Sequence, residues 1–126
     1  MKKGILYLRF ASIEQANNGE KAQKEYDFAE NYCAENGIEI IRVFDEISVK
    51  PPHERYYFDK ALKVAKYLAN DLTYFLVMDF SRISRKYEEF RTVQDELSSF
   101  GVYVHAINQS NCFTIEEYFD QLKAQR

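Results

Sequence analysis

The chain of 126 residues is long enough for one hydrophobic core and too short for two ordinary domains. Its 46% hydrophobic and 29% charged residues are typical of a globular protein, and no apolar run approaches the roughly 20 residues that span a bilayer. The net charge of −3 argues against a strong, autonomous nucleic-acid binder, because such domains are usually basic, but it permits a local basic patch.

The cysteines and histidines do not predict a disulfide framework or a metal site. Cys33 and Cys112 are interpreted as free thiols, and His53 and His105 are too scattered to complete a ligand set with them, so we expect no metal and no cofactor. His105 lies inside a predicted strand, where a hydrogen-bonded core residue is the commoner case. The N-terminus has only a brief apolar run, which does not indicate a secretion signal, and we expect a cytoplasmic protein.

Apolar runs of strand length recur along the chain. They predict strands at residues 4–10, 38–45, 73–79 and 102–108. The first of them, GILYLRF, is apolar at nearly every position, which is typical of a strand covered on both faces and therefore of a parallel sheet.

Segments with helical spacing separate these strands. They predict helices over 20–36, over 55–69, through Phe90–Phe100 and from the capping box at 114–117 onward. A polar turn at 16–20 precedes the first helix, and Pro51 and Pro52 keep the loop after the second strand out of regular structure. Alternating strands and helices predict an α/β fold with three layers, in which helices cover both faces of an open, mainly parallel sheet of about four strands.

Polar residues gather where three of the predicted strands end. In open parallel sheets the functional crevice lies beyond these carboxyl ends. The residues placed there are Arg9, Ala11, Ser12 and Gln15 after the first strand, Asp45, Ser48 and Arg55 after the second, and Ser81, Arg82, Ser84 and Arg85 after the third. Converging arginines form an anion site, because guanidinium groups suit phosphate oxygens.

The arginines do not all carry the same weight. Arg9 follows a buried strand that leaves little room for an idle charge. For Arg85 alone a solvated surface residue is the commoner case, since Lys86 and Glu88 lie beside it. We expect sulfate or phosphate to bind among Arg9, Arg82 and Arg85, whereas a contact of Arg9 with Asp45 or Asp79 would turn the site into an internal ion pair.

Other phosphate-binding folds fit less well. No glycine-rich segment follows the first strand, so a dinucleotide or P-loop site lacks its phosphate cradle. A phosphoacceptor receiver domain needs acidic residues at the end of the first strand to hold a cation, and Arg9 stands there instead.

The stretch YLRFASIEQ at 7–15 resembles the opening motif of the serine recombinases, the resolvase and invertase family. That motif has a tyrosine, an arginine two residues later, a hydrophobic residue, the nucleophilic serine, a second hydroxyl residue and a glutamine. The resemblance continues through Gln23, through FDEIS with Arg55, and through LVMDFSRISR, and it covers roughly residues 4–108.

The resemblance implies a resolvase-like catalytic domain at 1–108, with a loop and the start of an oligomerisation-type helix at 109–126. It implies that Arg9, Arg82 and Arg85 hold the scissile phosphate, that Arg55 assists, and that Gln15, Gln23 and Ser48 support the site. Members of the family attack DNA with a serine hydroxyl, form a phosphoserine link and exchange strands as oligomers. They use no metal, and arginines stabilise the transition state.

The chain departs from the family pattern at chemical positions. Ala11 stands where the family has its nucleophile, and Ser81 stands where it usually has an aspartate. A methyl group cannot attack phosphorus, and loss of a covalent nucleophile costs on the order of a millionfold in rate. Val49 replaces a common glycine, which bears on loop shape. The leading hypothesis is therefore a recombinase-like domain that binds DNA phosphates, forms oligomers with itself or with an active relative, and does not cleave.

Two alternatives stay open. In the first, the enzyme is active, because Ser12 replaces the missing serine or because Ala11 was introduced in place of a natural serine; Ser12 is disfavoured because adjacent residues at a strand end point opposite ways. In the second, the chain is a protein-interaction module that does not bind DNA, which its acidic balance and many aromatic residues permit.

Overall fold

The computed structural model describes residues 1–108 and 115–124, and its elements alternate along the chain as the sequence predicts. The strands are β1 (Lys2–Phe10), β2 (Ile38–Ile47), β3 (Tyr74–Val77) and β4 (Tyr103–Ala106). The helices are α1 (Ile13–Ala16), α2 (Glu20–Glu35), α3 (Tyr56–Tyr67), α4 (Tyr87–Ser99) and α5 (Ile115–Ala124). Single 3₁₀ turns are η1 (Asn17–Gly19), η2 (Pro52–Glu54) and η3 (Phe80–Arg82).

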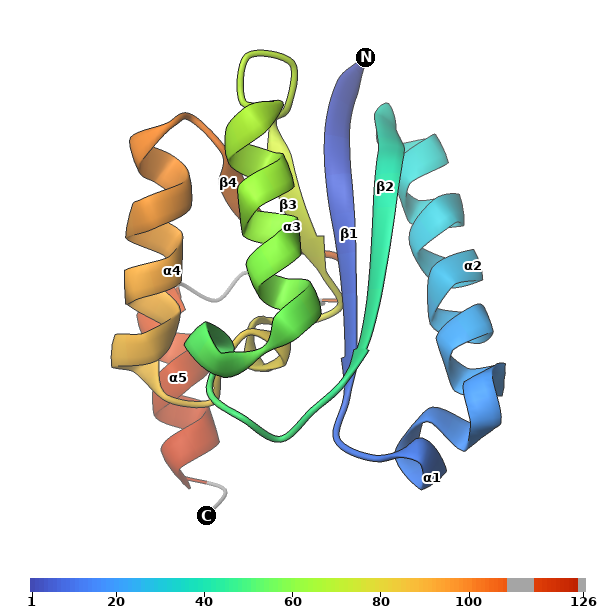
Figure 1. The fold of residues 1–126 in the computed structure, drawn as a ribbon, viewed down its shortest axis with the longest axis vertical. Coiled ribbons are helices and arrows are strands. Elements are labelled where there is room, and N and C mark those ends of the chain that lie inside the picture. The colour runs from blue at the N-terminus through green and yellow to red at the C-terminus, as the bar shows by residue number, and fades with distance from the viewer. Residues whose placement is uncertain (109–114, 125–126) are drawn as a thin grey trace.

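The strands form one parallel sheet in the order β2-β1-β3-β4. Helix α2 covers one face, and α3 and α4 cover the other (Figure 1). This arrangement confirms the predicted three-layer α/β fold. Because all strands run the same way, the carboxyl ends of β1, β2 and β3 meet at one edge, where Ser48 N–H donates to the carbonyl of Phe10 at 2.9 Å.

Strand β1 is buried on both faces because its side chains alternate between two cores. Ile5 and Tyr7 join Phe58 of α3 and Phe90 of α4 in one cluster, which Phe119 of α5 also enters. In the other cluster the β1 residues Leu6, Leu8 and Phe10 pack with Ala29 and Cys33 of α2. Each Å² of apolar surface that is buried contributes roughly 25 cal/mol to stability, and β1 buries apolar side chains on both of its faces. This explains why its sequence is apolar at nearly every position.

Helix α1 is the main difference from the sequence prediction. The predicted polar turn at 16–20 is preceded by this four-residue helix, which Ser12 caps by accepting a hydrogen bond from Gln15 N–H at 3.0 Å. The turn itself is made by Asn17 and Asn18, both left-handed at φ near 55°, which asparagine tolerates better than most residues. A helix of one turn has no periodic pattern to detect, which is why the sequence did not reveal it.

The C-terminal helix is described from Ile115, so the capping box at Thr114 lies outside the described residues. The helices and strands elsewhere begin and end within a few residues of the predicted positions. Within the described ranges, no helix combines the length and apolar sequence needed to cross a membrane.

Candidate functional site

A cleft of about 590 Å³ lies at the carboxyl edge of the sheet. Its basic lining residues are Arg9, Lys21, Lys50, Arg55, Arg82, Arg85 and Lys86, and its acidic lining residue is Glu89. The Glu89 carboxylate accepts a hydrogen bond from Ser84 Oγ at 2.6 Å. A chain of net charge −3 therefore concentrates positive charge at this edge, which is the local basic patch that the sequence allowed.

Arg9 extends from the end of β1 and binds three backbone carbonyls. Its Nε donates to the carbonyl of Arg82 at 2.8 Å, Nη1 to that of Ser48 at 3.0 Å and Nη2 to that of Ser81 at 3.2 Å. Burial and the neighbouring guanidinium group of Arg55 lower the pKa of Arg9. Among the described residues no carboxylate forms an ion pair with Arg9, so the contact with Asp45 or Asp79 that would have made this an internal ion pair is not formed.

Arg55 is the N-cap residue of α3 and is only 5% exposed. Its Nη1 donates to the carbonyl of Arg82 at 2.9 Å, and its Nε donates to that of Lys50 at 2.8 Å. The Arg82 carbonyl therefore accepts from two guanidinium groups. These bonds tie the loops after β2 and β3 together, and no carboxylate of residues 1–108 or 115–124 forms an ion pair with Arg9 or Arg55.

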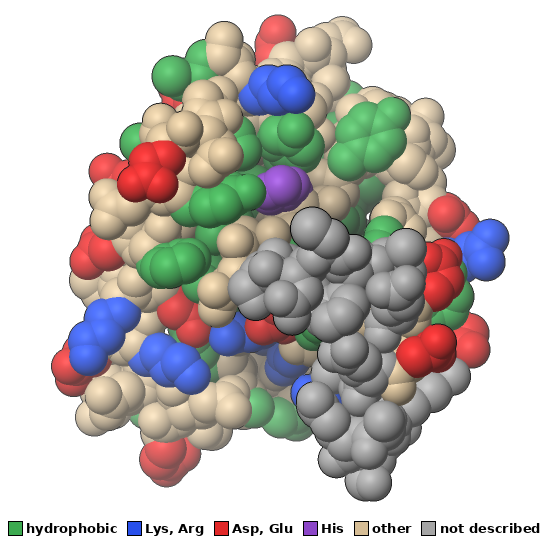
Figure 2. All heavy atoms as spheres, turned by 180° about the vertical axis from the view of Figure 1, so that it is seen from behind, with side chains coloured by type: hydrophobic (Ala, Val, Ile, Leu, Met, Phe, Trp, Pro, Cys, Tyr) green, Lys and Arg blue, Asp and Glu red, His purple; other side chains and the backbone are tan. Residues whose placement is uncertain are grey.

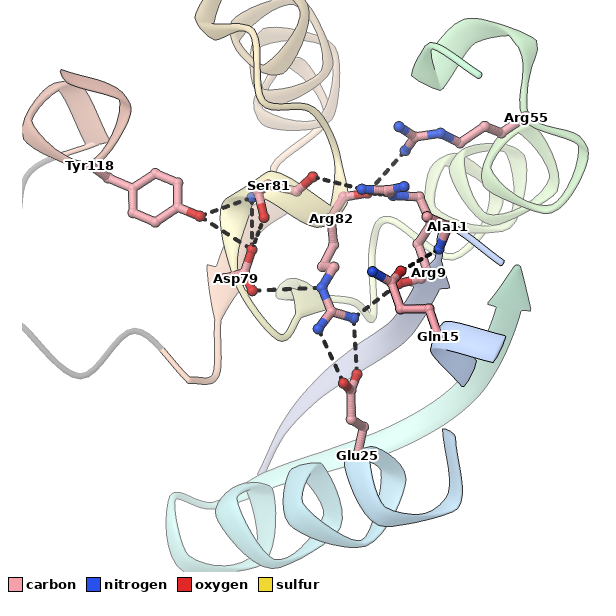
Figure 3. A network of polar contacts seen from close by, with 9 residues as sticks. All are labelled: Arg9, Ala11, Gln15, Glu25, Arg55, Asp79, Ser81, Arg82 and Tyr118. Carbon is pink, nitrogen blue, oxygen red and sulfur yellow. Dashed lines mark hydrogen bonds and ion pairs between the residues drawn. The ribbon is translucent and has the colours of Figure 1, made fainter. Parts of the chain in front are cut away.

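Arg82 differs from the other two, because its charge is already paired (Figure 3). Its Nη1 and Nη2 donate to the two carboxylate oxygens of Glu25 on α2 at 3.0 and 3.1 Å, and its Nε lies 3.6 Å from Asp79 Oδ2. Nη1 also donates to the carbonyl of Arg9 at 2.9 Å. A two-pronged pair of this kind is strong and directional, so it holds Arg82 toward α2.

Ala11 lines the cleft at the position that the family motif assigns to the nucleophile. Its backbone N–H donates to Gln15 Oε1 at 2.6 Å, which brings the Gln15 amide over the start of α1. Ser12 follows, and its Oγ accepts from the Gln15 backbone N–H as the cap of α1. Ala11 offers no hydroxyl to the cleft, and the hydroxyl of Ser12 caps a helix.

Ser81 is joined to a carboxylate two residues before it in the chain. Its Oγ donates to Asp79 Oδ1, and its backbone N–H donates to the same oxygen at 3.0 Å. Tyr118 of α5 also donates to Asp79 Oδ1, at 3.2 Å, and accepts from Ser81 N–H at 3.3 Å. The family aspartate is therefore absent at 81, but a carboxylate still lies beside Arg82, supplied by Asp79 (Figure 3).

The remaining predicted site residues fall into two groups. Arg85 is exposed and lines the cleft, and Ser48 contributes its carbonyl to Arg9. Gln23 is exposed on α2, donates to Asp27 Oδ1 at 2.9 Å and does not line the cleft. Asp45 lies exposed on edge strand β2 and also does not line it.

Two buried carboxylates that support the site were missed by reasoning from sequence. Glu25 pairs with Arg82, and Glu46 accepts from Tyr7 Oη at 2.5 Å and from the backbone N–H groups of Tyr57 and Phe58 at 2.8 and 3.2 Å. Glu46 thus satisfies two backbone N–H groups in the first turn of α3, the helix that Arg55 precedes. Glu25 falls on the apolar face of its helix, four residues before Ala29. This spacing could have predicted that Glu25 is buried and therefore paired with a positive charge.

A second hollow, of about 450 Å³, lies at the opposite edge of the sheet near Lys2, Tyr32, Tyr74 and His105. Seen from behind, the molecule gathers apolar side chains around a histidine (Figure 2). His105 Nε2 and Tyr32 Oη are 2.8 Å apart, and burial lowers the pKa of His105. His105 is hydrogen-bonded as the sequence predicts, but it is only partly buried and lines this hollow, so it is not a core residue. The described residues hold no cluster of three or more His, Cys, Asp or Glu side chains suited to a metal ion.

Solved structures share this fold. The chain has a TM-score of 0.71 with the N-terminal catalytic domain of TP901-1 integrase, at 16% identity, covering 98% of this chain and 93% of that one. With a resolvase family site-specific recombinase from Streptococcus pneumoniae the TM-score is 0.70 at 17% identity, covering 99% and 85%. With a serine recombinase from Sulfolobus solfataricus it is 0.62 at 22% identity, covering 99% and 80%. The architecture is thus that of serine recombinase catalytic domains.

The family itself is shown by sequence. The model of the resolvase N-terminal domain matches residues 4–125, and the chain belongs to that family. No curated protein matches the chain. The family assignment confirms the resemblance drawn from YLRFASIEQ and the later motifs.

Proposed function

We propose that this chain is a resolvase-type domain that binds the phosphodiester backbone of DNA in its arginine-lined cleft and does not cleave it. The observation that carries the proposal is the pairing of a basic cleft with Ala11 at the nucleophile position. The guanidinium groups of Arg9 and Arg55 supply unpaired charge where a phosphate would lie. No hydroxyl is present at position 11 to attack it.

The cleft is suited to an anion for an electrostatic reason. The lowered pKa of Arg9 reflects burial together with repulsion between neighbouring guanidinium groups. A bound phosphate offsets that repulsion, because its negative charge attracts both guanidinium groups. The exposed Lys21, Lys50 and Lys86 at the rim add the long-range attraction that nucleic-acid binding requires.

A domain that binds without cleaving has a role as an accessory subunit. We propose that it acts in recombination as part of an oligomer, with copies of itself or with an active relative, and that the segment from 109 onward contributes to that contact. Tyr118 of α5 touches the η3 loop through Asp79 and Ser81, so a partner that moves α5 would reach the cleft through these bonds.

The test compares the chain with an Ala11→Ser variant on supercoiled DNA. The chain should bind DNA in a salt-dependent manner and form no covalent protein–DNA adduct on a denaturing gel. A covalent adduct formed by the unaltered chain would overturn the proposal. An adduct formed by Ala11→Ser alone would show that the rest of the site is competent and that the methyl group is what prevents cleavage.

The alternative of an active enzyme using Ser12 has its own control. Ser12 caps α1, so Ser12→Thr should preserve the cap and Ser12→Ala should remove it, at a cost of about 1 kcal/mol in unfolding free energy. Neither variant should change DNA binding or adduct formation if the chain is non-cleaving. The protein-interaction alternative predicts instead that the chain fails to bind DNA even at low salt.

A further inference from the structure

An exposed apolar group borders the arginine-lined cleft at the end of β2 and the start of α3. Ile47, Val49, Tyr56 and Tyr57 are exposed by 51%, 78%, 61% and 47%. They surround or adjoin a hollow of about 270 Å³ that Ile47, Tyr56 and Tyr57 line. Scattered single apolar residues need no explanation, but large side chains gathered beside a basic cleft do.

The two tyrosine rings leave aromatic surface free. Their centroids are 5.0 Å apart and their planes meet at 82°, so the edge of one ring meets a face of the other. Lys60 Nζ lies over the Tyr56 ring, 4.6 Å from its centre. The exposed fractions of both residues show that much of the pair's surface remains open to solvent in spite of these two contacts.

The hollow adjoins the cleft, because the two share lining residues. Lys50 and Arg55 line both of them. Because Arg55 donates to the same Arg82 carbonyl as Arg9 and also lines the hollow, a nucleic-acid strand with one phosphate in the cleft can extend toward Tyr56 and Tyr57. Of the two carboxylates that line the hollow, Glu46 is engaged by internal donors and Glu54 lies 3.7 Å from His53 Nε2.

A basic groove beside free aromatic faces is the arrangement that binds single strands. Every base has a face that can stack on an aromatic ring, whereas in a duplex these faces are hidden inside the base stack. Positive charge alone attracts both forms. The tyrosine pair is therefore what distinguishes them.

Building on the proposed function, we infer that the chain prefers single-stranded DNA, with a backbone phosphate in the arginine cleft and an unpaired base stacked on Tyr56 or Tyr57. Ile47 supplies an aliphatic contact at the side of the stacked base. The ligand class is thus an unpaired segment of DNA such as a gap, an overhang or a melted site.

The experiment measures fluorescence anisotropy of a labelled oligothymidylate of about 20 nucleotides and of its duplex, at low salt, with the full chain. The single strand should bind more tightly. The Tyr56→Ala/Tyr57→Ala double variant should lose roughly tenfold or more in affinity for the single strand while its affinity for the duplex changes little. A double phenylalanine variant keeps both rings and should retain binding. Tyr67→Ala, on the same helix and 88% exposed, is the matched control and should change nothing.

Photochemical cross-linking gives an independent measurement. An oligonucleotide carrying 5-bromodeoxyuridine should attach to the peptide that contains Tyr56 and Tyr57. Equal affinity for single strand and duplex, or an unchanged affinity in the double alanine variant, overturns the inference. If the double alanine variant changes self-association and leaves oligonucleotide binding unchanged, the surface is a protein interface and the inference is also overturned.

Failure of this inference is distinguishable from failure of the proposed function. If both DNA forms bind equally and both weaken in Arg85→Ala, the phosphate cleft stands and the stacking surface is wrong. If neither form binds, both proposals are overturned.

Discussion

Glu25 and Arg82 form a two-pronged ion pair across the molecule, from α2 to the loop after β3, at 3.0 and 3.1 Å. Their side chains are 11% and 18% exposed. The pair therefore does two things. It anchors the η3 loop to α2. It also occupies the guanidinium group of Arg82, which the resemblance to the family motif assigns to phosphate binding.

Removal of the Glu25 charge should weaken the fold. Glu25→Gln leaves the largely buried Arg82 guanidinium without its main counter-ion, and we expect the free energy of unfolding to fall by about 1–3 kcal/mol. Urea denaturation measures this. Glu20→Gln on the same helix is the control, because Glu20 pairs with Lys24 in solvent and such pairs contribute about 0–1 kcal/mol. Equal losses in the two variants would contradict a structural role for the Glu25 pair.

The same substitution should strengthen anion binding. Once Arg82 is free of Glu25, its guanidinium group becomes available to an anion in the cleft, so Glu25→Gln should bind inorganic phosphate or sulfate several-fold more tightly. Isothermal titration calorimetry measures the affinity. If it is unchanged or weaker, Arg82 acts only in the fold, and the anion site consists of Arg9, Arg55 and Arg85.

Arg85 should contribute to binding without contributing to stability. It is exposed and lines the cleft, so Arg85→Ala should change the free energy of unfolding by less than about 0.5 kcal/mol. It should weaken DNA binding at all sequences and reduce the slope of log K against log salt by about 1. Arg91→Ala is the matched control, since Arg91 is exposed on α4, lies 3.7 Å from Asp95 and does not line the cleft. A slope unaffected by Arg85→Ala would place the bound phosphate elsewhere.

Tyr7 should make the protein sensitive to alkaline pH. Burial and the hydrogen bond to Glu46 raise the pKa of Tyr7 in the folded chain, whereas in the unfolded chain it titrates near pH 10. The stabilisation from the retained proton is complete below pH 10 and is lost as the pH rises above that value. Wild type should therefore lose more unfolding free energy between pH 9 and 11 than Tyr7→Phe does. Tyr67→Phe, on the exposed face of α3, should lose as much as wild type.

Tyr118 should link the C-terminal helix to the site. Its hydroxyl contacts Asp79 Oδ1 and Ser81 N–H, so Tyr118→Phe should lower the free energy of unfolding by about 0.5–1.5 kcal/mol. Proton–deuterium exchange in the η3 loop should accelerate in the same variant. Tyr103→Phe serves as the control because Tyr103 is 54% exposed on the edge strand β4. Unchanged exchange in the η3 loop would mean that α5 is not coupled to the arginines through this contact.

Much of the fold was predictable because its signals are local. The alternation along β1 and the helical spacing of apolar residues in α2, α3 and α4 each arise from neighbours within one element. Helix α1 was missed since a single turn carries no period. In the site, the sequence indicated that Arg9 would be engaged by polar partners, because a charged side chain at the end of a strand buried on both faces needs them.

The choice of those partners was beyond the sequence. Arg9 binds carbonyl groups of Ser48, Ser81 and Arg82 rather than a carboxylate, and Arg82 binds Glu25, which lies 57 residues away in the chain. Gln23, placed in the site by the motif, points instead toward Asp27 on its own helix. Spacing along the chain states nothing about which of several arginines meets a given carboxylate.

The sequence by itself determined the parallel α/β fold, the membership of the resolvase family and the absence of a serine at position 11. Only the tertiary structure decided which guanidinium groups keep their charge available and which are neutralised. The fold and the motif depend on residues that are close together in the chain. Which arginine in the cleft is paired with a carboxylate depends instead on contacts between helix α2 and the loops that follow β2 and β3, which are far apart in the chain.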